Sequence, residues 1–145
     1  MEIPDMEFRQ FIDDHDGRRA EFVRENLEAL QIRHLAEWDV LAFIYRHGTN
    51  LASADYIARL LGYGKAVVGA ALDSLTSTGL VRRSRTSHGV RLYQIATSIP
   101  DDPRRRYLEE LMNLTEERRG RILLIAHLRQ ASGSGLRGRA GLHLA

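Results

Sequence analysis

The feature that most constrains this chain is a pair of short helices separated by a single glycine. Ser53 is a good N-cap, and the residues after it predict a helix over 54–61. Gly62 ends this helix, because glycine readily adopts the left-handed conformation that a tight turn needs. A second helix is predicted over 64–78, closed by Gly79. Two helices this close in sequence must cross at a short turn.

Small and apolar residues fall where such a crossing needs them. Ala58, four positions before the glycine, is small enough to let the second helix approach closely. The residues that face inward are Ile57 and Leu61 from the first helix, and Val68 and Ala71 from the second. This pattern indicates a helix-turn-helix, although an ordinary helical pair has the same spacing.

After the second helix, the spacing of apolar residues changes to that of strands. Strand-like runs cover residues 80–85 and 90–95, and the polar turn 86–89 separates them. Two strands joined by so short a polar loop predict a β-hairpin.

The charge of the chain is unevenly distributed. Residues 1–58 carry twelve acids and six arginines, whereas residues 59–145 carry fifteen bases and seven acids. Within residues 59–99 there are six bases and one acid, Asp73. This excess of positive charge is either a phosphate-facing surface or a solvated basic face.

Residues 75–83 read Leu-Thr-Ser-Thr-Gly-Leu-Val-Arg-Arg, and the basic hairpin follows them. In this stretch the chain resembles the winged helix-turn-helix regulators, most closely the MarR-type group. In that group a recognition helix ends in a Leu-x-x-x-Gly-Leu-Val element that leads into a basic wing strand. The resemblance covers about residues 37–96. It implies a mainly α fold with a small antiparallel β-wing (α+β), in which flanking helices form a dimer.

The resemblance also implies how the parts would meet DNA. The 64–78 helix would be the recognition helix and would enter the major groove, with its N-terminal residues nearest the bases. The 85–91 loop would be the wing and would reach a neighbouring groove or the backbone. Leu51 would sit in a short strand that completes a three-stranded sheet with the hairpin. Two protomers would bind two half-sites of double-stranded DNA.

The candidate DNA-binding residues lie at the start of the recognition helix, along its exposed face and in the wing: Tyr63, Lys65, Ala66, Val67, Ala70, Arg82, Arg83, Arg85, Ser87, His88 and Arg91. Arg85 and Arg91 flank the wing turn and are the preferred contacts, since a wing-tip arginine can enter a narrow minor groove. Ser87 and His88 at the tip either bond phosphate or sugar or are simply solvated.

Several of these candidates have a second interpretation. Arg82 and Arg83 are consecutive in a strand and point to opposite faces, so at most one faces DNA squarely and the other pairs with a carboxylate. Lys65 and Tyr63 lie at a helix N-terminus, where donors and backbone amides favour phosphate. Tyr63 is equally well explained as a core residue.

The exposed face of the recognition helix departs from the family pattern, which places Thr, Ser and Arg there. This chain has Val67, Gly69, Ala70 and Ser74 instead. None of these makes the bidentate contacts that read guanine or adenine, although Val67 or Ala70 can touch a thymine methyl group. We therefore expect binding to depend on backbone charge, DNA shape and the wing. The alternative is a winged-helix protein–protein interaction module, with this face packed against protein.

Helices are predicted on both sides of the winged segment. Residues 6–14 and 18–34 are predicted to form two helices, separated by an interruption at Asp13–Gly17. A long helix begins at Asp101-Asp102-Pro103 and extends to about Gln130, with room for a kink or break near Gly120. The predicted organisation is an N-terminal dimerisation segment, the winged domain, a C-terminal dimerisation helix and a flexible Gly-rich tail, over residues 1–36, 37–98, 99–131 and 132–145.

The two flanking helices carry more apolar surface than one small winged domain can cover, which favours a homodimer. The candidate dimer-interface residues are Phe8, Phe11, Leu108, Leu111, Ile122, Ile125 and Leu128. Ordinary packing within one chain is the alternative. A pocket between the dimer part and the winged domain could bind a small-molecule effector, which nothing in the sequence identifies.

Other classes of function find no support in the sequence. There is no cysteine, which excludes disulfides and thiolate metal sites. The acidic cluster at 13–16 fits no helical ligand face, and residues 62–65 are too short for a phosphate-binding loop. No nucleophile–base pair is evident, no apolar run approaches the roughly 18 residues of a membrane span, and the N-terminus lacks a signal peptide. We expect a cytoplasmic, non-enzymatic regulator without metal or cofactor.

Overall fold

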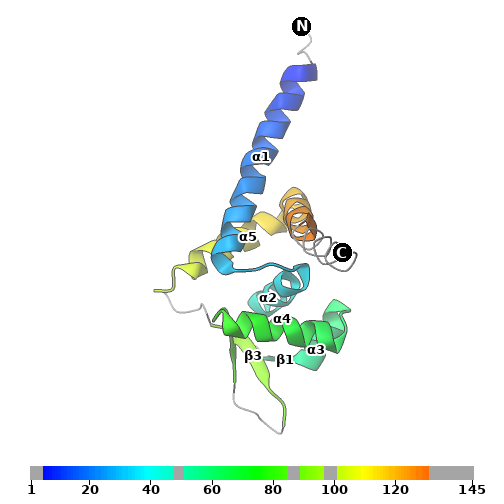
Figure 1. Cartoon of the computed structure of the whole chain (residues 1–145), viewed down its shortest axis with the longest axis vertical. Coiled ribbons are helices and arrows are strands. Elements are labelled where there is room, and N and C mark those ends of the chain that lie inside the picture. Colours follow the sequence, from blue (N-terminus) through cyan, green and yellow to red (C-terminus); the bar gives the residue numbers. More distant parts are fainter. Residues whose placement is uncertain (1–4, 48–50, 85–88, 97–100, 131–145) are drawn as a thin grey trace, which may run out of the picture.

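The computed structural model describes residues 5–47, 51–84, 89–96 and 101–130, with side chains of the first helix from Gly17 onward. Figure 1 shows the winged unit at one end, and the first helix with the C-terminal helices at the other. The winged unit consists of α2 (Leu35–Arg46), α3 (Ala54–Leu61), α4 (Lys65–Ser77) and the sheet. The predicted fold class, mainly α with a small antiparallel β-wing, is confirmed.

The sheet has three short antiparallel strands in the order β1-β3-β2. They are β1 (Ala52–Ser53), β2 (Val81–Arg83) and β3 (Leu92–Ile95). The third strand that the resemblance implied is therefore present, directly after Leu51 rather than at it. Val81 and Tyr93 are buried on the face of the sheet that packs against the helices. The two hairpin strands are shorter than predicted, and residues 85–88 lie outside the described part of the chain.

The first helix, α1 (Asp5–Leu30), is continuous, so the predicted interruption at Asp13–Gly17 is wrong. Glycine costs a helix interior about 1 kcal/mol, and Asp or His costs less. That is too little to break a helix whose Val23, Leu27 and Leu30 are all buried at helical spacing. In Figure 1 the N-terminal half of α1 extends away from the other elements.

The predicted helix over 101–130 is two helices. α5 (Arg104–Glu116) ends at Glu117, whose backbone is extended (φ −79°, ψ 136°), and residues 118–130 form the next helix. The Glu117 N–H still donates to the Leu114 carbonyl, at 3.2 Å. Gly120 is buried against the same carbonyl, where a Cβ atom would overlap it. The break thus precedes the glycine, and the glycine allows the start of the second helix to pack closely against Leu114 near the end of α5.

The core is continuous from the winged unit into the helical end. Leu72 and Leu75 of α4 are buried, as are Leu108 and Leu111 of α5 and Leu128 of the last helix. Packing within the chain therefore accounts for Leu108, Leu111 and Leu128, whose apolar pattern had suggested a dimer interface. Ile125 is half-buried, and Ile122 is 55% exposed. The side chains of Phe8 and Phe11 lie outside the described residues, as does the predicted tail.

Among the helices that the structure describes, none is long and apolar enough to cross a membrane.

Candidate nucleic-acid interface

The turn between α3 and α4 forms as the sequence predicts. The Ser53 hydroxyl accepts a hydrogen bond from the Tyr56 N–H at 3.2 Å and caps α3. Gly62 adopts the left-handed conformation (φ 76°), and its N–H donates to the Ala58 carbonyl at 2.9 Å. Gly79 after α4 is also left-handed (φ 78°). These local features set the crossing of α3 and α4, and so the direction in which α4 presents its outer face.

The outer face of α4 is apolar and has few hydrogen-bonding groups. Ala66 and Ala70 are exposed and Val67 is 45% exposed, whereas Val68 and Ala71 face the core. The polar side chains that follow are Asp73, which is exposed, and Ser74, whose hydroxyl donates to Glu37 Oε2 at 2.5 Å. The helix therefore offers methyl groups to a partner over most of its exposed first half.

Glu37 was not among the predicted site residues. It is buried, and its other carboxylate oxygen accepts from the backbone N–H groups of Arg33 and His34, at 3.1 and 2.9 Å. An acid three residues after a helix N-cap is the spacing of a capping box, which is the signal that could have identified it. This carboxylate joins the start of α2 to α4 and occupies the Ser74 hydroxyl.

The two predicted polar residues at the start of α4 differ in availability. Lys65 lies 3.4 Å from Asp55, but both side chains are largely exposed, so the ion pair contributes little and can exchange for a phosphate. Tyr63 is half-buried, and its hydroxyl donates to Asp39 Oδ2 at 2.5 Å. Burial, together with this carboxylate, raises the pKa of Tyr63 to about 12. Its hydroxyl serves the packing of the turn on α2.

The wing strand places consecutive arginines on opposite faces, as predicted. Arg82 lies across from Gln94, and Arg83 lies across from Tyr93. With the Gln94 amide oxygen turned toward Arg82, it accepts from Nε at 3.1 Å and from Nη2 at 2.6 Å, so the partner is an amide rather than the predicted carboxylate. Arg83 is exposed and forms no ion pair within the described residues.

On the returning side of the wing, Arg91 is exposed just before β3. It too forms no ion pair within the described residues. Arg85, Ser87 and His88 at the wing tip lie outside the described part of the chain.

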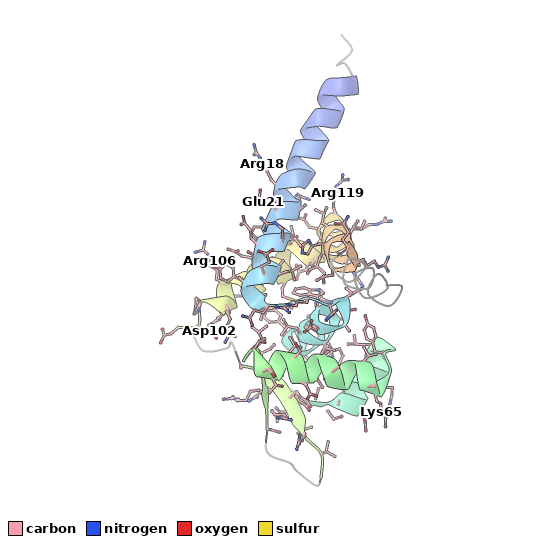
Figure 2. The ribbon with its side chains drawn as sticks, viewed as in Figure 1. Arg18, Glu21, Lys65, Asp102, Arg106 and Arg119 are labelled. Carbon is pink, nitrogen blue, oxygen red and sulfur yellow. The ribbon has the colours of Figure 1, made fainter. Side chains whose placement is uncertain are left out.

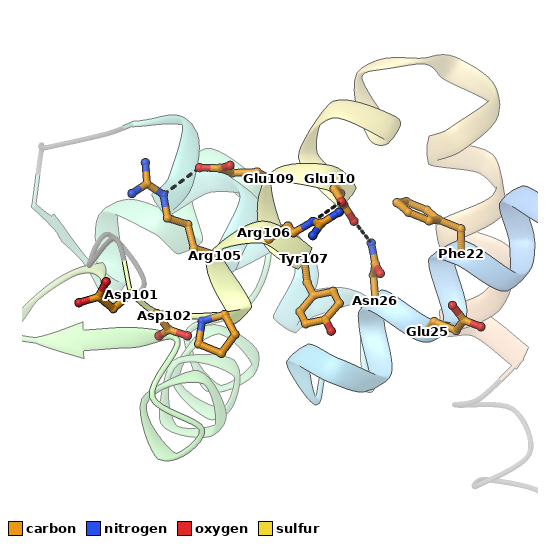
Figure 3. A pocket seen from close by; sticks show the side chains of 11 residues that line it. Phe22, Glu25, Asn26, Asp101, Asp102, Arg105, Arg106, Tyr107, Glu109 and Glu110 are labelled. Carbon is orange, nitrogen blue, oxygen red and sulfur yellow. Dashed lines mark hydrogen bonds and ion pairs between the residues drawn. The ribbon is translucent and has the colours of Figure 1, made fainter.

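Two of the hollows in the described part of the chain lie next to α5. The larger, about 760 Å³, runs between α1 and the start of α5 and holds Phe22, Asn26 and Tyr107 (Figure 3). Five carboxylates and two arginines also line it: Glu25, Asp101, Asp102, Glu109, Glu110, Arg105 and Arg106. The smaller, about 220 Å³, lies between α2 and the junction of the last two helices, with Trp38 and Phe43 among its lining. Within the described residues, no cluster of His, Asp and Glu side chains could hold a metal ion.

A helix-turn-helix followed by a β-hairpin that pairs with a short strand ahead of it is a winged helix-turn-helix. Residues 33–91 match the sequence profile of the MarR family, which confirms the resemblance of this segment to MarR-type regulators. No curated protein sequence matches the chain.

The whole chain has the fold of solved MarR-type regulators. A substituted S. aureus MepR bound to an oligodeoxyribonucleotide is similar, with a TM-score of 0.54 and 16% identity over 99% of this chain and 97% of that one. A second substituted MepR, from a multidrug-resistant S. aureus clinical isolate, has a TM-score of 0.52 and 17% identity over 99% and 96% of the chains. A MarR transcriptional regulator from Methanosarcina mazei Go1 has a TM-score of 0.51 and 18% identity over 96% and 92%.

Proposed function

We propose that this chain is a homodimeric, DNA-binding transcription regulator, with binding weighted to the wing arginines and to contacts with the DNA backbone. One observation carries the proposal: α4 and the hairpin lie together at the end of the molecule away from α1 (Figure 1), and exposed cations surround them. The described cations are Lys65, Arg82, Arg83 and Arg91, and the predicted Arg85 adds to them. The S. aureus relative bound to an oligodeoxyribonucleotide supports DNA as the partner.

Electrostatics predicts the form of the binding. Each phosphate that a cation neutralises releases condensed counterions, so log K should fall linearly with log salt, by about 0.9 per phosphate contact. The methyl groups on α4 add weak discrimination at best. Affinity for unrelated duplexes should therefore be substantial at low salt.

The test is fluorescence anisotropy with labelled random and genomic duplexes over a range of salt concentrations. Replacing Arg83 and Arg91 by Ala should weaken binding to all duplexes similarly and lower the salt slope by about 2. The matched control replaces Arg18 of α1 and Arg106 of α5 by Ala, because it also removes two positive charges and Figure 2 shows both residues far from the wing. Absence of binding to any duplex at low salt would refute the function, and a loss confined to one sequence would refute the assigned role of the arginines.

Dimerisation would use surface that the single chain leaves uncovered. On the helix of residues 118–130, Ile122 is 55% exposed and lines a hollow with Leu123, Arg118 and Arg119. We include Phe8 and Phe11 of α1 in the interface on the sequence pattern alone. Light scattering should give about twice the chain mass of 16.5 kDa, and Ile122→Glu should shift it toward the monomer. A wild-type mass near 16.5 kDa at micromolar concentration would refute the dimer.

A protein-docking role is the second candidate, and one observation favours it. Val67 and Ala70 line a shallow groove of about 540 Å³ with His34 and Ala36 at the start of α2. Its lining is mainly apolar, as in a protein interface. The salt titration separates the two, since a docking module has no affinity for random duplexes.

We propose that a small-molecule effector binds in the hollow between α1 and α5, beside the start of α5. Phe22 and Tyr107 supply aromatic surface there, and Asn26 supplies a buried amide. A ligand that raises the melting temperature of the wild type but not of Phe22→Ala would support this position. An equal rise in both proteins would contradict it.

A further inference from the structure

The start of α5 is joined to the end of α4 by an arginine that a neighbouring carboxylate holds in place. Asp102 Oδ1 accepts from the Arg104 backbone N–H at 2.9 Å and from its Nε at 3.3 Å, while Oδ2 lies 3.1 Å from Nη2. Both side chains are mostly buried, at 31% and 18% exposure for Arg104 and Asp102. Two carboxylate oxygens on one guanidinium group leave it little freedom to rotate.

The other side of this guanidinium group faces the end of the proposed recognition helix. Nη1 donates to the Thr78 carbonyl, and Nη2 donates to the Gly79 carbonyl at 3.3 Å. These residues follow Ser77, the last residue of α4. Carbonyls here have lost their helical partners and lie at the negative end of the helix dipole, where a cation is favourable. A Cβ atom on Gly79 would lie 3.4 Å from Nη2, so the arginine fills this space closely.

This connection matters because α4 and α5 otherwise pack mainly against different elements. α4 packs mainly on α2, α3 and β2, whereas α5 packs mainly on α1. Figure 2 shows Asp102 near one end of α4, with Lys65 at the other. The Asp102–Arg104 pair therefore bridges the DNA-reading helix and the helical part that would form the dimer.

We propose that Arg104, held by Asp102, is a positioning residue that fixes the angle of α4 relative to α5, and through it the separation of the two recognition helices in the dimer. This rests on the proposed function. α4 has 13 residues and is about 20 Å long, so a rotation of roughly 10° about its C-terminal end moves its N-terminus by about 3 Å. Consecutive base pairs are about 3.4 Å apart, so such a rotation is close to one base pair of misregister.

The first experiment measures α4 against α5 without DNA. The chain has no cysteine, so Ala70→Cys on α4 and Arg106→Cys on α5 place two spin labels at exposed positions. The labelled chain is mixed with an excess of unlabelled chain, so that most dimers carry one labelled protomer. Pulsed electron spin resonance should then give one narrow distance distribution in this background, and Arg104→Ala should broaden it. Arg105→Ala is the matched control, because this neighbouring arginine is exposed and, among the described residues, forms its ion pair with Glu109, four residues on. An unchanged distribution in Arg104→Ala would overturn the proposal.

The second experiment measures DNA register. A duplex bound by the wild type is compared with versions that have one base pair added or removed between the half-sites. Because the methyl groups on α4 discriminate only weakly, the wild type should prefer one spacing by about two- to fivefold. Arg104→Ala should lose this preference, and Arg104→Lys should fall between because it keeps the charge without the fork. Arg105→Ala should match the wild type.

The outcomes separate the two claims. If Arg104→Ala lowers the melting temperature but keeps the wild-type preference for one spacing, its role is only structural and the proposal is overturned. If the wild type binds no duplex, both the proposed function and the claim about DNA register are refuted. The distances between the spin labels still test whether Arg104 positions α4.

Discussion

Gly120→Ala tests how the last two helices meet. In the structure a Cβ atom on Gly120 would overlap the Leu114 carbonyl oxygen and lie 2.8 Å from both the carbonyl carbon and Cγ of Leu114. Carbon atoms pack best at about 3.5–4.0 Å, so the two helices must separate by roughly 1 Å. The obstacle is backbone, which cannot rotate away as a side chain can.

The expected cost follows from this overlap. Forced overpacking of a core costs about 1–3 kcal/mol and occasionally more, and the helix propensity that alanine gains over glycine returns at most about 1 kcal/mol. Because the clash involves backbone, we expect the overpacking to cost about 3–4 kcal/mol, which leaves a net loss of about 2–3 kcal/mol in the free energy of unfolding. For a chain of this size that lowers the melting temperature by roughly 10 °C.

The assay is thermal unfolding followed by circular dichroism, at matched protein concentrations because a dimer melts in a concentration-dependent way. The control is Gly17→Ala in α1, where an added Cβ atom meets nothing within 4 Å. It should stabilise the chain by about 0.5–1 kcal/mol. If Gly120→Ala melts within about 2 °C of the wild type while Gly17→Ala behaves as expected, the close approach of Gly120 to Leu114 is refuted.

Three further predictions concern the winged unit. Replacing a thymine by uracil in a bound duplex removes only the thymine methyl group. If Val67 and Ala70 contact this methyl group, affinity should fall about two- to fivefold. Equal affinity after replacement at every thymine position would show that these residues make no such contact. Tyr63→Phe should cost about 1 kcal/mol by removing the bond to Asp39. Because the pKa of Tyr63 is raised to about 12, between about pH 10 and pH 12 only the unfolded chain releases the Tyr63 hydroxyl proton, and the free energy of unfolding of the wild type should fall. In denaturant titrations over this range, Tyr63→Phe should lose this part of the pH dependence. Ser53→Ala should cost about 1 kcal/mol in the same titrations, and no loss would contradict its role as an N-cap.

Much of the winged unit could be predicted because its signals are local. An N-cap serine acts on residues three positions away, and the left-handed conformation of Gly62 and Gly79 depends on those residues themselves. The alternation along β2 likewise placed Arg82 and Arg83 on opposite faces. The apolar outer face of α4 could also be predicted from the sequence, because helical spacing determines which of its residues are exposed.

The errors and omissions concern interactions between distant segments. Local composition suggested a break at Asp13–Gly17, but burial of residues further along α1 outweighs the weak helix propensity there. The bonds from Tyr63 to Asp39 and from Ser74 to Glu37 join residues that are 24 and 37 positions apart, so neither could be found from spacing.

The sequence by itself determined where this chain turns: its caps, glycines and apolar periods specify a helix-turn-helix and a basic hairpin, because each of these acts within a few residues. Only the tertiary structure decided how those parts are held. It buries Leu108, Leu111 and Leu128 within one chain, and it brings Arg104 to the end of a helix that finishes 27 residues earlier. Such contacts depend on the path of the whole backbone, which no local pattern records.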